Sequence, residues 1–405
     1  MSEVLPEGWN NQKLGSLAKI TDGAHKTPKY QVTGIPFLRV TDIKSTRIDL
    51  NSVKYISEEE HHQLCKRCKA EEGDILYSKN GTIGIPKIIN WNWEFSIFVS
   101  LALIKIIEKQ RLDTKFLYCI LKSQFIEKQI KDRAKQGTVS NLHLEEINEF
   151  ELLLPPLPEQ KKIASILTSV DEVIENTQKQ IDKLQDLKKA TMNELLTKGI
   201  GHTEFKDSEL GRIPKSWEVV ELGDLCEFTQ GVQISLADTL RNPRVGYIRY
   251  LYINDFSSDS KLRFVEDKYP GKIVSKTDLV MANTGHTAGT IFKGKIGVLS
   301  NNAFKISSSY KIHSEYLYHF LSTDDYWLRI GRLFNTAGQP HVGHGNIAKL
   351  LFSCPPIDEQ KKITSVFHRI EENIICKKRK LAQTQALKKS LMQDLLTGKK
   401  RVQVN

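Results

Sequence analysis

The sequence predicts an α+β protein built as an internal repeat: two globular mixed α/β domains and two long antiparallel coiled-coil helices, related by approximate two-fold symmetry. The main observation is that residues 155–197 recur at 355–397 without a gap. A fainter repeat relates the residues that precede each copy. A repeat of this length indicates that one architecture is used twice along the chain.

Each copy of the repeated stretch is predicted to form one long helix. Pro155-Pro156 and Pro355-Pro356 stand where a helix can begin, because a proline before or within the first turn costs no hydrogen bond. After these opening segments, about forty residues follow without Gly or Pro. At 1.5 Å per residue, each helix would be roughly 60 Å long.

Apolar residues recur in each copy at alternating steps of three and four, which is the spacing of a coiled-coil seam. Lys188 and Lys388 interrupt the seam at matching positions. One narrow seam on so long a helix needs a partner, and the other copy is the obvious one. The alternative is that each seam packs on its own globular domain. The seam residues are Ile163, Leu167, Val170, Ile174, Ile181 and Leu184 in the first copy, and Ile363, Phe367, Ile370, Ile374, Leu381 and Leu391 in the second.

A globular domain precedes each helix, and this order sets the direction of the pair. If the first helix runs from the first domain to the second, the second helix must start at the second domain and return. We therefore expect antiparallel helices with the domains at opposite ends. The expected boundaries are 1–154 for the first domain, 155–208 for the first helix, 209–354 for the second domain, and 355–405 for the second helix and a basic tail.

Composition narrows the class of protein. With 40% apolar and 26% charged residues, the chain is typical of a globular protein with real cores. The longest apolar run, 95–107, is too short to span a bilayer, and the polar start does not look like a signal peptide. Six cysteines show no disulfide spacing, so we expect a cytoplasmic protein. The net charge of +11 is only a weak indication of nucleic acid, because neither domain is strongly basic.

The two domains show similar features in the same order. Leu5-Pro6-x-x-Trp9 recurs as Ile213-Pro214-x-x-Trp217. Alternating residues predict strands at 37–43 and 250–256. Short helices are predicted at 58–70, 114–136 and 313–330.

Polar loops between these elements carry the candidate binding residues. Arg, Lys, Asn and Gln side chains read base edges, while Ser, Thr and backbone N–H groups hold phosphates. The alternative is that these are ordinary solvated loops. The candidates in the first domain are His25, Lys26, Thr27, Lys29, Tyr30, Arg39, Lys79, Asn80, Thr82, Thr138, Ser140 and Asn141. Those in the second domain are Gln230, Gln233, Arg249, Asn283, Thr284, His286, Thr287, Gln339 and His341.

Motifs for catalysis or metal binding are incomplete. Residues 289–296 follow the phosphate-loop spacing, but Ile296 stands where a Ser or Thr hydroxyl would hold magnesium. Cys65-x-x-Cys68 beside two histidines hints at zinc, but no second ligand pair follows. A nucleophile elbow and a dinucleotide fingerprint are both missing. We therefore predict no catalytic residue, no metal site and no bound cofactor in this chain.

Several motifs together resemble a known family. Residues 155–163 read PPLPEQKKI and residues 355–363 read PPIDEQKKI, each opening a long helix, while 395–402 forms a basic closing segment. Asp22-Gly23-x-His25-x-Thr27-Pro28 in the first domain adds to the likeness. The chain resembles, over essentially its whole length, the specificity subunit of Type I restriction–modification systems.

The resemblance implies a non-catalytic reader of double-stranded DNA. Each globular domain would be a target recognition domain that reads one half of an asymmetric bipartite site. The helix pair would set the spacer and dock two modification subunits, which use S-adenosylmethionine to methylate adenine. Restriction subunits would supply ATP- and magnesium-dependent cleavage in a prokaryotic cytoplasm.

Two departures from the family pattern stand out. Lys198-Gly199 replaces Gly-Lys after the first helix, and residues 229–232 lack the His-x-Thr-Pro part of the first domain's loop. An adaptor scaffold that uses the coiled coil without touching DNA is the alternative function.

Overall fold

The computed structural model describes residues 5–45, 47–134, 141–333 and 340–404. The chain forms two compact units. Unit one comprises Met1–Gln178 with Arg379–Asn405, and unit two comprises Lys179–Lys378. Each unit therefore holds one globular domain together with half of each long helix. No helix in the described ranges is both long and apolar enough to cross a membrane.

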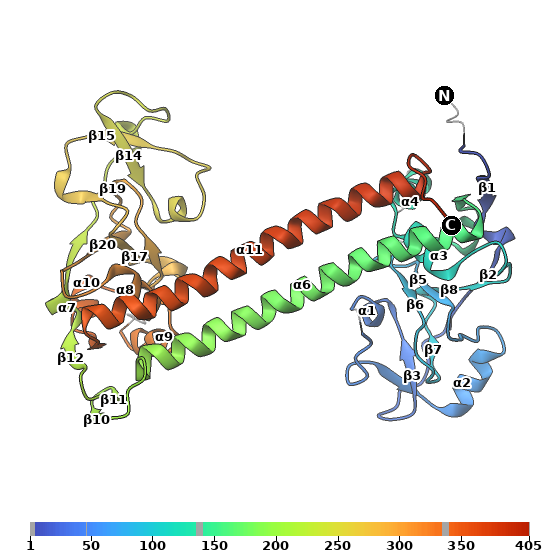
Figure 1. Cartoon of the computed structure of the whole chain (residues 1–405), viewed down its shortest axis with the longest axis horizontal. Helices are drawn as coiled ribbons and strands as arrows, with labels where there is room; N and C mark the ends of the chain where they lie inside the picture. Colours follow the sequence, from blue (N-terminus) through green and yellow to red (C-terminus); the bar gives the residue numbers. More distant parts are fainter. Residues whose placement is uncertain (1–4, 46, 135–140, 334–339, 405) are drawn as a thin grey trace. The chain divides into compact units, whose positions relative to one another are not determined.

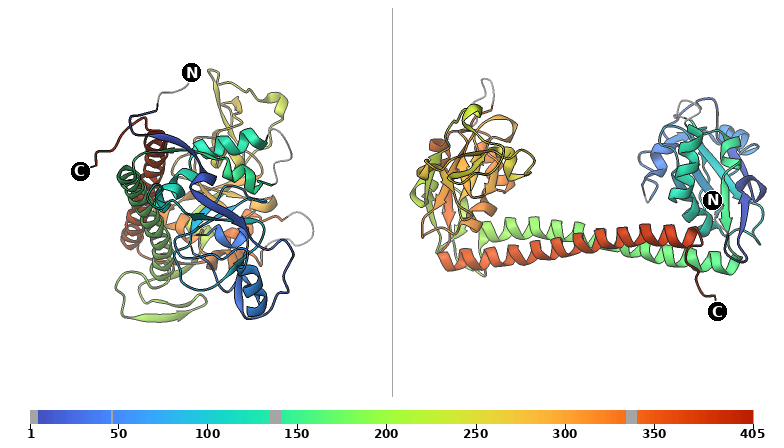
Figure 2. Two further views of the ribbon diagram at one scale, coloured as in Figure 1. Left: turned by 90° about the vertical axis from the view of Figure 1, so that its right-hand side faces the viewer. Right: turned by 90° about the horizontal axis from the view of Figure 1, so that it is seen from above.

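The two predicted long helices are confirmed. Helix α6 spans Leu157–Lys198 and helix α11 spans Ile357–Leu396. Each begins directly after its proline pair and is followed closely by a glycine with positive φ, Gly199 at 66° and Gly398 at 74°, a common way to end a helix. Within each unit the two helices lie side by side (Figures 1 and 2). The N-terminal half of α6 accompanies the C-terminal half of α11 in unit one, as antiparallel helices require.

The predicted seam is buried or half-buried along its whole length. Its parts differ in what they contact. Ile163 and Leu167 belong to the core of the first domain, and Ile363 and Phe367 belong to the core of the second. The start of each helix thus packs on its own domain together with the end of the other helix, since Leu395 joins the first cluster and Leu196 joins the second.

The first domain is built from two small sheets, one two-stranded pair and short helices (Figure 1). One sheet has the strand order β2-β8-β5-β6 and the other β4-β3-β7, while β1 pairs with β9. The strands are β1 Asn10–Lys13, β2 Ala18–Asp22, β3 Ile35–Leu38, β4 Lys54–Ile56, β5 Ile75–Ser78, β6 Pro86–Ile88, β7 Ser96–Ile97, β8 Leu101–Ile106 and β9 Glu151–Leu154. The helices are the 3-10 turn η1 Leu14–Ser16, α1 Val40–Ile43, α2 Glu58–Cys65, α3 Thr114–Leu121, α4 Gln124–Ala134 and α5 Leu144–Asn148.

The second domain repeats this topology with one additional strand, β16, in its second sheet. Its sheets have the orders β13-β20-β17-β18 and β15-β14-β19-β16, and β12 pairs with β21. The strands are β12 Glu218–Glu221, β13 Cys226–Gln230, β14 Tyr247–Leu251, β15 Phe264–Glu266, β16 Ile273–Val274, β17 Leu279–Ala282, β18 Ile291–Lys293, β19 Gly297–Leu299, β20 Ala303–Ser308 and β21 Leu351–Cys354. The helices are α7 Leu222–Leu225, α8 Ser314–Phe320, α9 Asp324–Ile330 and α10 His344–Ala348, with 3-10 turns η2 Leu236–Asp238, η3 Ile253–Phe256, η4 Pro270–Lys272 and η5 Gly285–Thr287. A hairpin of β10 Phe205–Ser208 and β11 Gly211–Pro214 precedes the domain.

Two of the short predicted helices are each divided in two. The expected helix at 114–136 is broken between α3 and α4, where Ser123 Oγ accepts a hydrogen bond from Ile126 N at 3.4 Å. The expected helix at 313–330 is broken between α8 and α9, where Thr323 Oγ1 accepts from Tyr326 N at 3.2 Å. A Ser or Thr in this position caps a new helix start. The third helix, predicted at 58–70, ends at Cys65.

The glutamine of the repeated motif joins each long helix to its domain. Gln160 Nε2 donates to the carbonyl of Arg111 at 2.7 Å, and Gln160 Oε1 accepts from Asp113 N at 3.0 Å. Gln360 makes the same two bonds to residues 311–313, at 3.1 and 2.8 Å. Both glutamines are fully buried. The repetition of this residue in the sequence therefore has a structural reason.

The neighbouring glutamate holds the segment that follows the opposite helix. Glu159 accepts two hydrogen bonds from the guanidinium of Arg401, both at 2.8 Å. Glu359 accepts instead from Trp217 Nε1 at 3.0 Å and contacts His202 Nε2 at 2.7 Å. Both carboxylates are thus paired with donors, and in each unit the glutamate binds the segment that follows the opposite helix.

Candidate nucleic-acid interface

Two predicted loops of each domain lie next to each other in the fold. The loop after β5 and the segment that enters α5 form a bridge between Asn80 and Asn141. In the second domain, Thr284 and His341 form the matching bridge. These four candidates come together although some sixty residues separate the two partners of each bridge. The candidates Thr138, Ser140 and Gln339 lie outside the described residues.

In the first domain, polar side chains gather around the buried carboxylate of Asp22 at the end of β2. The ammonium of Lys79 lies 3.4 Å from Asp22 Oδ2, and Nε2 of His25 lies 3.1 Å from Oδ1. The guanidinium of Arg67 also pairs with Oδ1. We call Asp22, His25, Arg67 and Lys79 the Asp22 cluster. It brings together two predicted residues, His25 and Lys79, and two that were not among the candidates, Asp22 and Arg67.

The members of the Asp22 cluster differ in exposure. The Lys79 side chain is only 6% exposed, whereas those of His25 and Arg67 are 56% and 57% exposed. Lys79 thus serves Asp22 as an interior counter-ion, while the other two reach solvent. Among the other predicted residues of this domain, Lys26, Thr27, Lys29, Tyr30 and Thr82 are exposed. Arg39 is half-buried, and its guanidinium makes two bonds of 3.2 Å to Asp42.

A cavity of about 340 Å³ lies beside the Asp22 cluster. Side chains that donate or accept hydrogen bonds line much of it: Asp22, His25, Lys26, Glu60, Gln63 and Arg67. The last three come from α2 and the turn after it. Arg67 stands inside Cys65-x-x-Cys68, a spacing that is typical of metal sites and does not indicate a role for the arginine. Its pairing with Asp22, 45 residues away, has no local signature.

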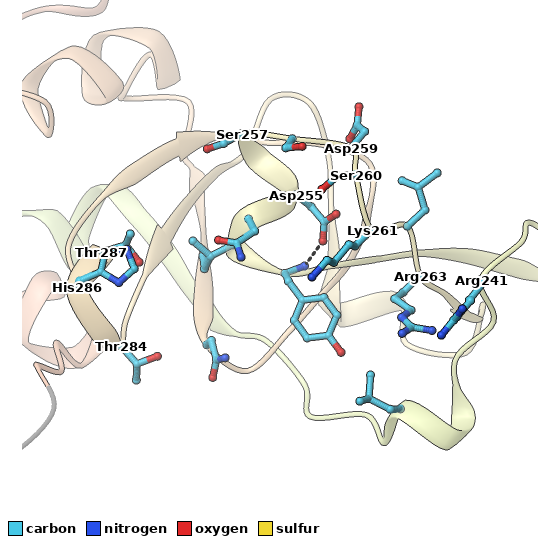
Figure 3. Close-up of a pocket in the computed structure, with 17 residues that line it drawn as sticks. Arg241, Asp255, Ser257, Asp259, Ser260, Lys261, Arg263, Thr284, His286 and Thr287 are labelled. Carbon is cyan, nitrogen blue, oxygen red and sulfur yellow. Dashed lines mark hydrogen bonds between the residues drawn. The ribbon is translucent and has the colours of Figure 1, made fainter. Parts of the chain in front are cut away.

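The second domain has a larger, open cleft of about 1310 Å³. Figure 3 shows Arg241 and Arg263 close together on one side, and Thr284, His286 and Thr287 on the other. Lys261 also lines the cleft. None of the three cations Arg241, Lys261 and Arg263 forms an ion pair with another residue that the structure describes. Unpaired cations facing hydroxyl and imidazole groups are a suitable surface for an anionic, hydrogen-bonding ligand.

An ion-pair network anchors the loop that forms one wall of this cleft. Nη2 of Arg249 lies 3.0 Å from Asp255 and 2.6 Å from Asp259, and Lys295 Nζ lies 3.2 Å from Asp259. Burial opposes the charge of Arg249, but its hydrogen bonds to both aspartates outweigh this and raise its pKa. The Arg249 side chain is mostly buried. Arg249 therefore positions the loop. The cations of the cleft that form no ion pair with described residues are Arg241, Lys261 and Arg263.

Three further predicted residues of the second domain surround the turn at Asn301. Gln230 Nε2 donates to the Asn301 carbonyl at 2.5 Å, and Asn283 Nδ2 donates to the same oxygen at 3.4 Å. Gln233 Oε1 accepts from Asn301 Nδ2 at 3.2 Å. Asn283 is buried, and none of the three lines the cleft.

The cysteine motif of the first domain lies at the end of α2 and in the turn after it. Cys65 Sγ lies 3.5 Å from His61 Nε2, and His61 Nδ1 lies 2.9 Å from Ser96 Oγ. Burial raises the pKa of both Cys65 and Cys68, which keeps the thiols protonated. Within the described ranges, no group of three or more His, Cys, Asp or Glu side chains is placed to hold a metal ion.

The fold and the site define an internally duplicated protein. It has two domains with polar binding surfaces, and each domain forms one compact unit with half of each long helix. The Type I restriction modification DNA specificity domain matches the chain at residues 6–186 and 214–386. The chain belongs to this family.

Individual relatives agree with the family match. The chain is 27% identical over 428 residues to the Type I restriction enzyme MjaVIII specificity subunit of Methanocaldococcus jannaschii, covering 98% of this chain and 94% of the relative. The S subunit of a type I restriction–modification system from M. genitalium has a similar fold, with a TM-score of 0.58 and 15% identity over 98% of both chains. A chain solved in work on complex assembly and conformational transition of the type I system gives a TM-score of 0.60, at 15% identity over 98% of this chain and 99% of that one.

Proposed function

We propose that the chain is the DNA-reading specificity subunit of a Type I restriction–modification complex. Each domain reads one half of a bipartite site in double-stranded DNA. One observation carries the proposal beyond family membership: the duplicated fold presents different exposed side chains in its two domains. His25 and Arg67 line the cavity of the first domain, whereas Arg241 and Lys261 line the cleft of the second. Unlike side chains read unlike bases, so the site is asymmetric.

The helix pair, in this proposal, fixes the spacing of the two half-sites. A helix of 42 residues and one of 40 residues form a stiff element, and a rigid connection between two DNA readers restricts the half-site separation. The same helices are the docking site for two modification subunits. Support comes from the repetition of the helix sequence, because two similar surfaces suit two copies of one partner.

The chemistry belongs to the partner subunits. Modification subunits bind S-adenosylmethionine and methylate adenine, and restriction subunits use ATP and magnesium to cleave DNA. This chain contributes sequence recognition and assembly, in the cytoplasm of a prokaryote. The support is the family's description as a DNA specificity domain.

The test is to combine the chain with the modification subunits of its system and map methylated adenines on genomic DNA. We expect one bipartite, asymmetric motif with a single spacer length. A complex that forms but methylates no defined motif, and does not prefer any duplex over random DNA in gel-shift assays, would favour the adaptor scaffold.

A further inference from the structure

The Asp22 cluster holds an exposed arginine in a fixed position at the mouth of a cavity. Arg67 pairs with Asp22 through Nη2, and the same nitrogen lies 2.9 Å from His25 Nε2. A guanidinium has five donor hydrogens, and these contacts occupy only one of its three nitrogens. Nε and Nη1 have no partner among the residues that the structure describes.

The carboxylate that holds Arg67 is itself immobilised. Asp22 is 2% exposed at the end of a sheet strand, and its second oxygen faces the buried ammonium of Lys79. A buried carboxylate with a buried counter-ion has little freedom to reorient. It orients the arginine in advance, which reduces the entropy that the long side chain would lose on binding a ligand.

The cavity beside Arg67 offers groups that suit a base edge. His25, Gln63 and Glu60 line it together with the arginine, so donors and acceptors converge on a space of about 340 Å³. Glu60 accepts a hydrogen bond from the backbone N of Lys29 at 3.3 Å. A purely phosphate-binding surface would not need a carboxylate, whereas Glu accepts from the amino group of cytosine and Arg donates to guanine.

The second domain lacks this cluster at the matching place. There Gln230 replaces Asp22, and its amide bonds to the backbone at Asn301 and Ala303. The fold therefore does not require the Asp22–Arg67 pair. The Asp22 cluster is present in only one of the two domains. It can therefore give that domain a sequence specificity that the other domain does not have.

We infer that Arg67 is a base-reading residue of the first domain and that it recognises a guanine in that domain's half-site. Asp22 is its positioning residue, and Lys79 supports Asp22. This inference rests on the proposed function and adds the residue that sets specificity at one base pair. Because Nη2 is held by Asp22 and His25, Arg67 donates to guanine through Nη1 or Nε, and we expect discrimination near the lower end of the about 5- to 150-fold that a bidentate pair gives.

The experiment uses the complex of full-length chain and modification subunits, with methylome mapping as the readout. In Arg67→Ala, we expect one guanine of one half-site to become degenerate, while the other half-site and the spacer stay unchanged. Arg67→Lys should relax the same position, because a single ammonium cannot pair with Asp22 and also present a second nitrogen to the base. Asp22→Asn should weaken discrimination at that position too, with Arg67 still present.

A matched control is Lys66→Ala, which removes one exposed positive charge from the adjacent residue. Lys66 should affect overall affinity and its salt dependence only, and leave the motif unchanged. If Arg67→Ala abolishes methylation, gel shifts with duplexes carrying each base at each position of the half-site decide the question. Loss of preference at one position supports the inference.

The inference fails if Arg67→Ala retains both half-sites in full, or if it loses affinity equally for all sequences as Lys66→Ala does. Failure of the proposed function looks different. In that case the unaltered complex itself shows no bipartite motif, and no variant is needed to see it.

Discussion

Lys188 of α6 and Glu371 of α11 form an ion pair, with Nζ and Oε1 2.7 Å apart. Lys388 and Asp171 form the matching pair in the other unit, at 2.5 Å. Position 188 corresponds to 388 in the repeat, and 171 corresponds to 371. The same two repeat positions are therefore paired twice, once in each unit. The lysines that interrupt the apolar seam in the sequence are the residues that join the helices electrostatically, and we expect them to fix the antiparallel register.

The first prediction concerns this ion pair. The Lys388 and Asp171 side chains are 15% and 37% exposed, so the pair is better shielded from water than a surface salt bridge. Lys388→Ala should lower the free energy of unfolding by about 1–2 kcal/mol, because Asp171 is left without its counter-ion. Chemical denaturation of the single and double variants gives the coupling energy, which we expect to be about 1 kcal/mol. Lys389→Ala, on an exposed neighbour, should change stability by less than about 0.5 kcal/mol. A coupling energy of zero would mean that the pair does not set the register.

The second prediction concerns the buried glutamine of the repeated motif. Gln160→Ala removes the partners of the Arg111 carbonyl and the Asp113 amide, both of which are bonded to it. A buried backbone group without a partner costs about 1–3 kcal/mol, so we expect a loss of about 2–4 kcal/mol in the free energy of unfolding. Gln360→Ala should have a similar effect in the second unit. Gln383→Ala, on the exposed surface of α11, is the control and should be nearly neutral. A loss no greater than the control's would show that the glutamine does not connect helix and domain.

Local sequence patterns predicted the long helices but not every short element: the strands expected at 37–43 and 250–256 end at Leu38 and Leu251, where α1 and η3 follow. The proline pairs and the absence of glycine identified α6 and α11 almost to the residue. The division of residues 114–136 into two helices was missed, because Ser123 could equally have been an interior helix residue. The antiparallel direction of the two long helices was predicted from the order of domains and helices along the chain alone.

The candidate site was predictable only in part. The sequence identified polar loops, but it could not show that Lys79 would be buried against Asp22, or that Arg249 would be neutralised by Asp255 and Asp259. Such pairings depend on which strands become neighbours. Arg67 was overlooked for the same reason. Charged residues in a predicted loop are therefore a weak indication of a binding site. Charged side chains that the fold leaves exposed and holds in one orientation are a stronger one.

The third prediction is a pH dependence that originates at His319. This residue of α8 is 1% exposed, its Nε2 has no partner in the described structure, and its ring packs 4.7 Å from that of Phe367. Burial lowers its pKa to about 4, although Glu371 acts in the opposite direction. In the unfolded state the pKa of this histidine is near 6.5. Between about pH 6.5 and 4 the unfolded chain therefore binds a proton at this residue that the folded chain does not.

Stability should consequently be complete above about pH 6.5 and decline as the pH falls towards 4, by about 3 kcal/mol from this group alone. Denaturation curves at pH 7, 6, 5 and 4 measure the decline. His319→Cys introduces the residue found at the equivalent position 119 of the first domain, and it should flatten the profile of the second unit. An unchanged profile in that variant would assign the acid sensitivity to other groups.

The last prediction tests whether the helix pair measures DNA. Seven residues inserted after Gln178 and seven after Lys378 lengthen both helices between the two ion pairs. Both pairs and the phase of the seam are preserved, because seven residues are one heptad. The insertion adds about 10 Å at 1.5 Å per residue, which corresponds to about three base pairs at 3.4 Å each. Methylome mapping of the reconstituted complex should show a spacer longer by that amount, with both half-sites unaltered. Insertion in α6 alone puts the helices out of register and should reduce methylation instead. If the lengthened pair keeps the original spacer, something other than the helices determines the spacer length. If the half-sites change, the domains do not read DNA independently of the helices.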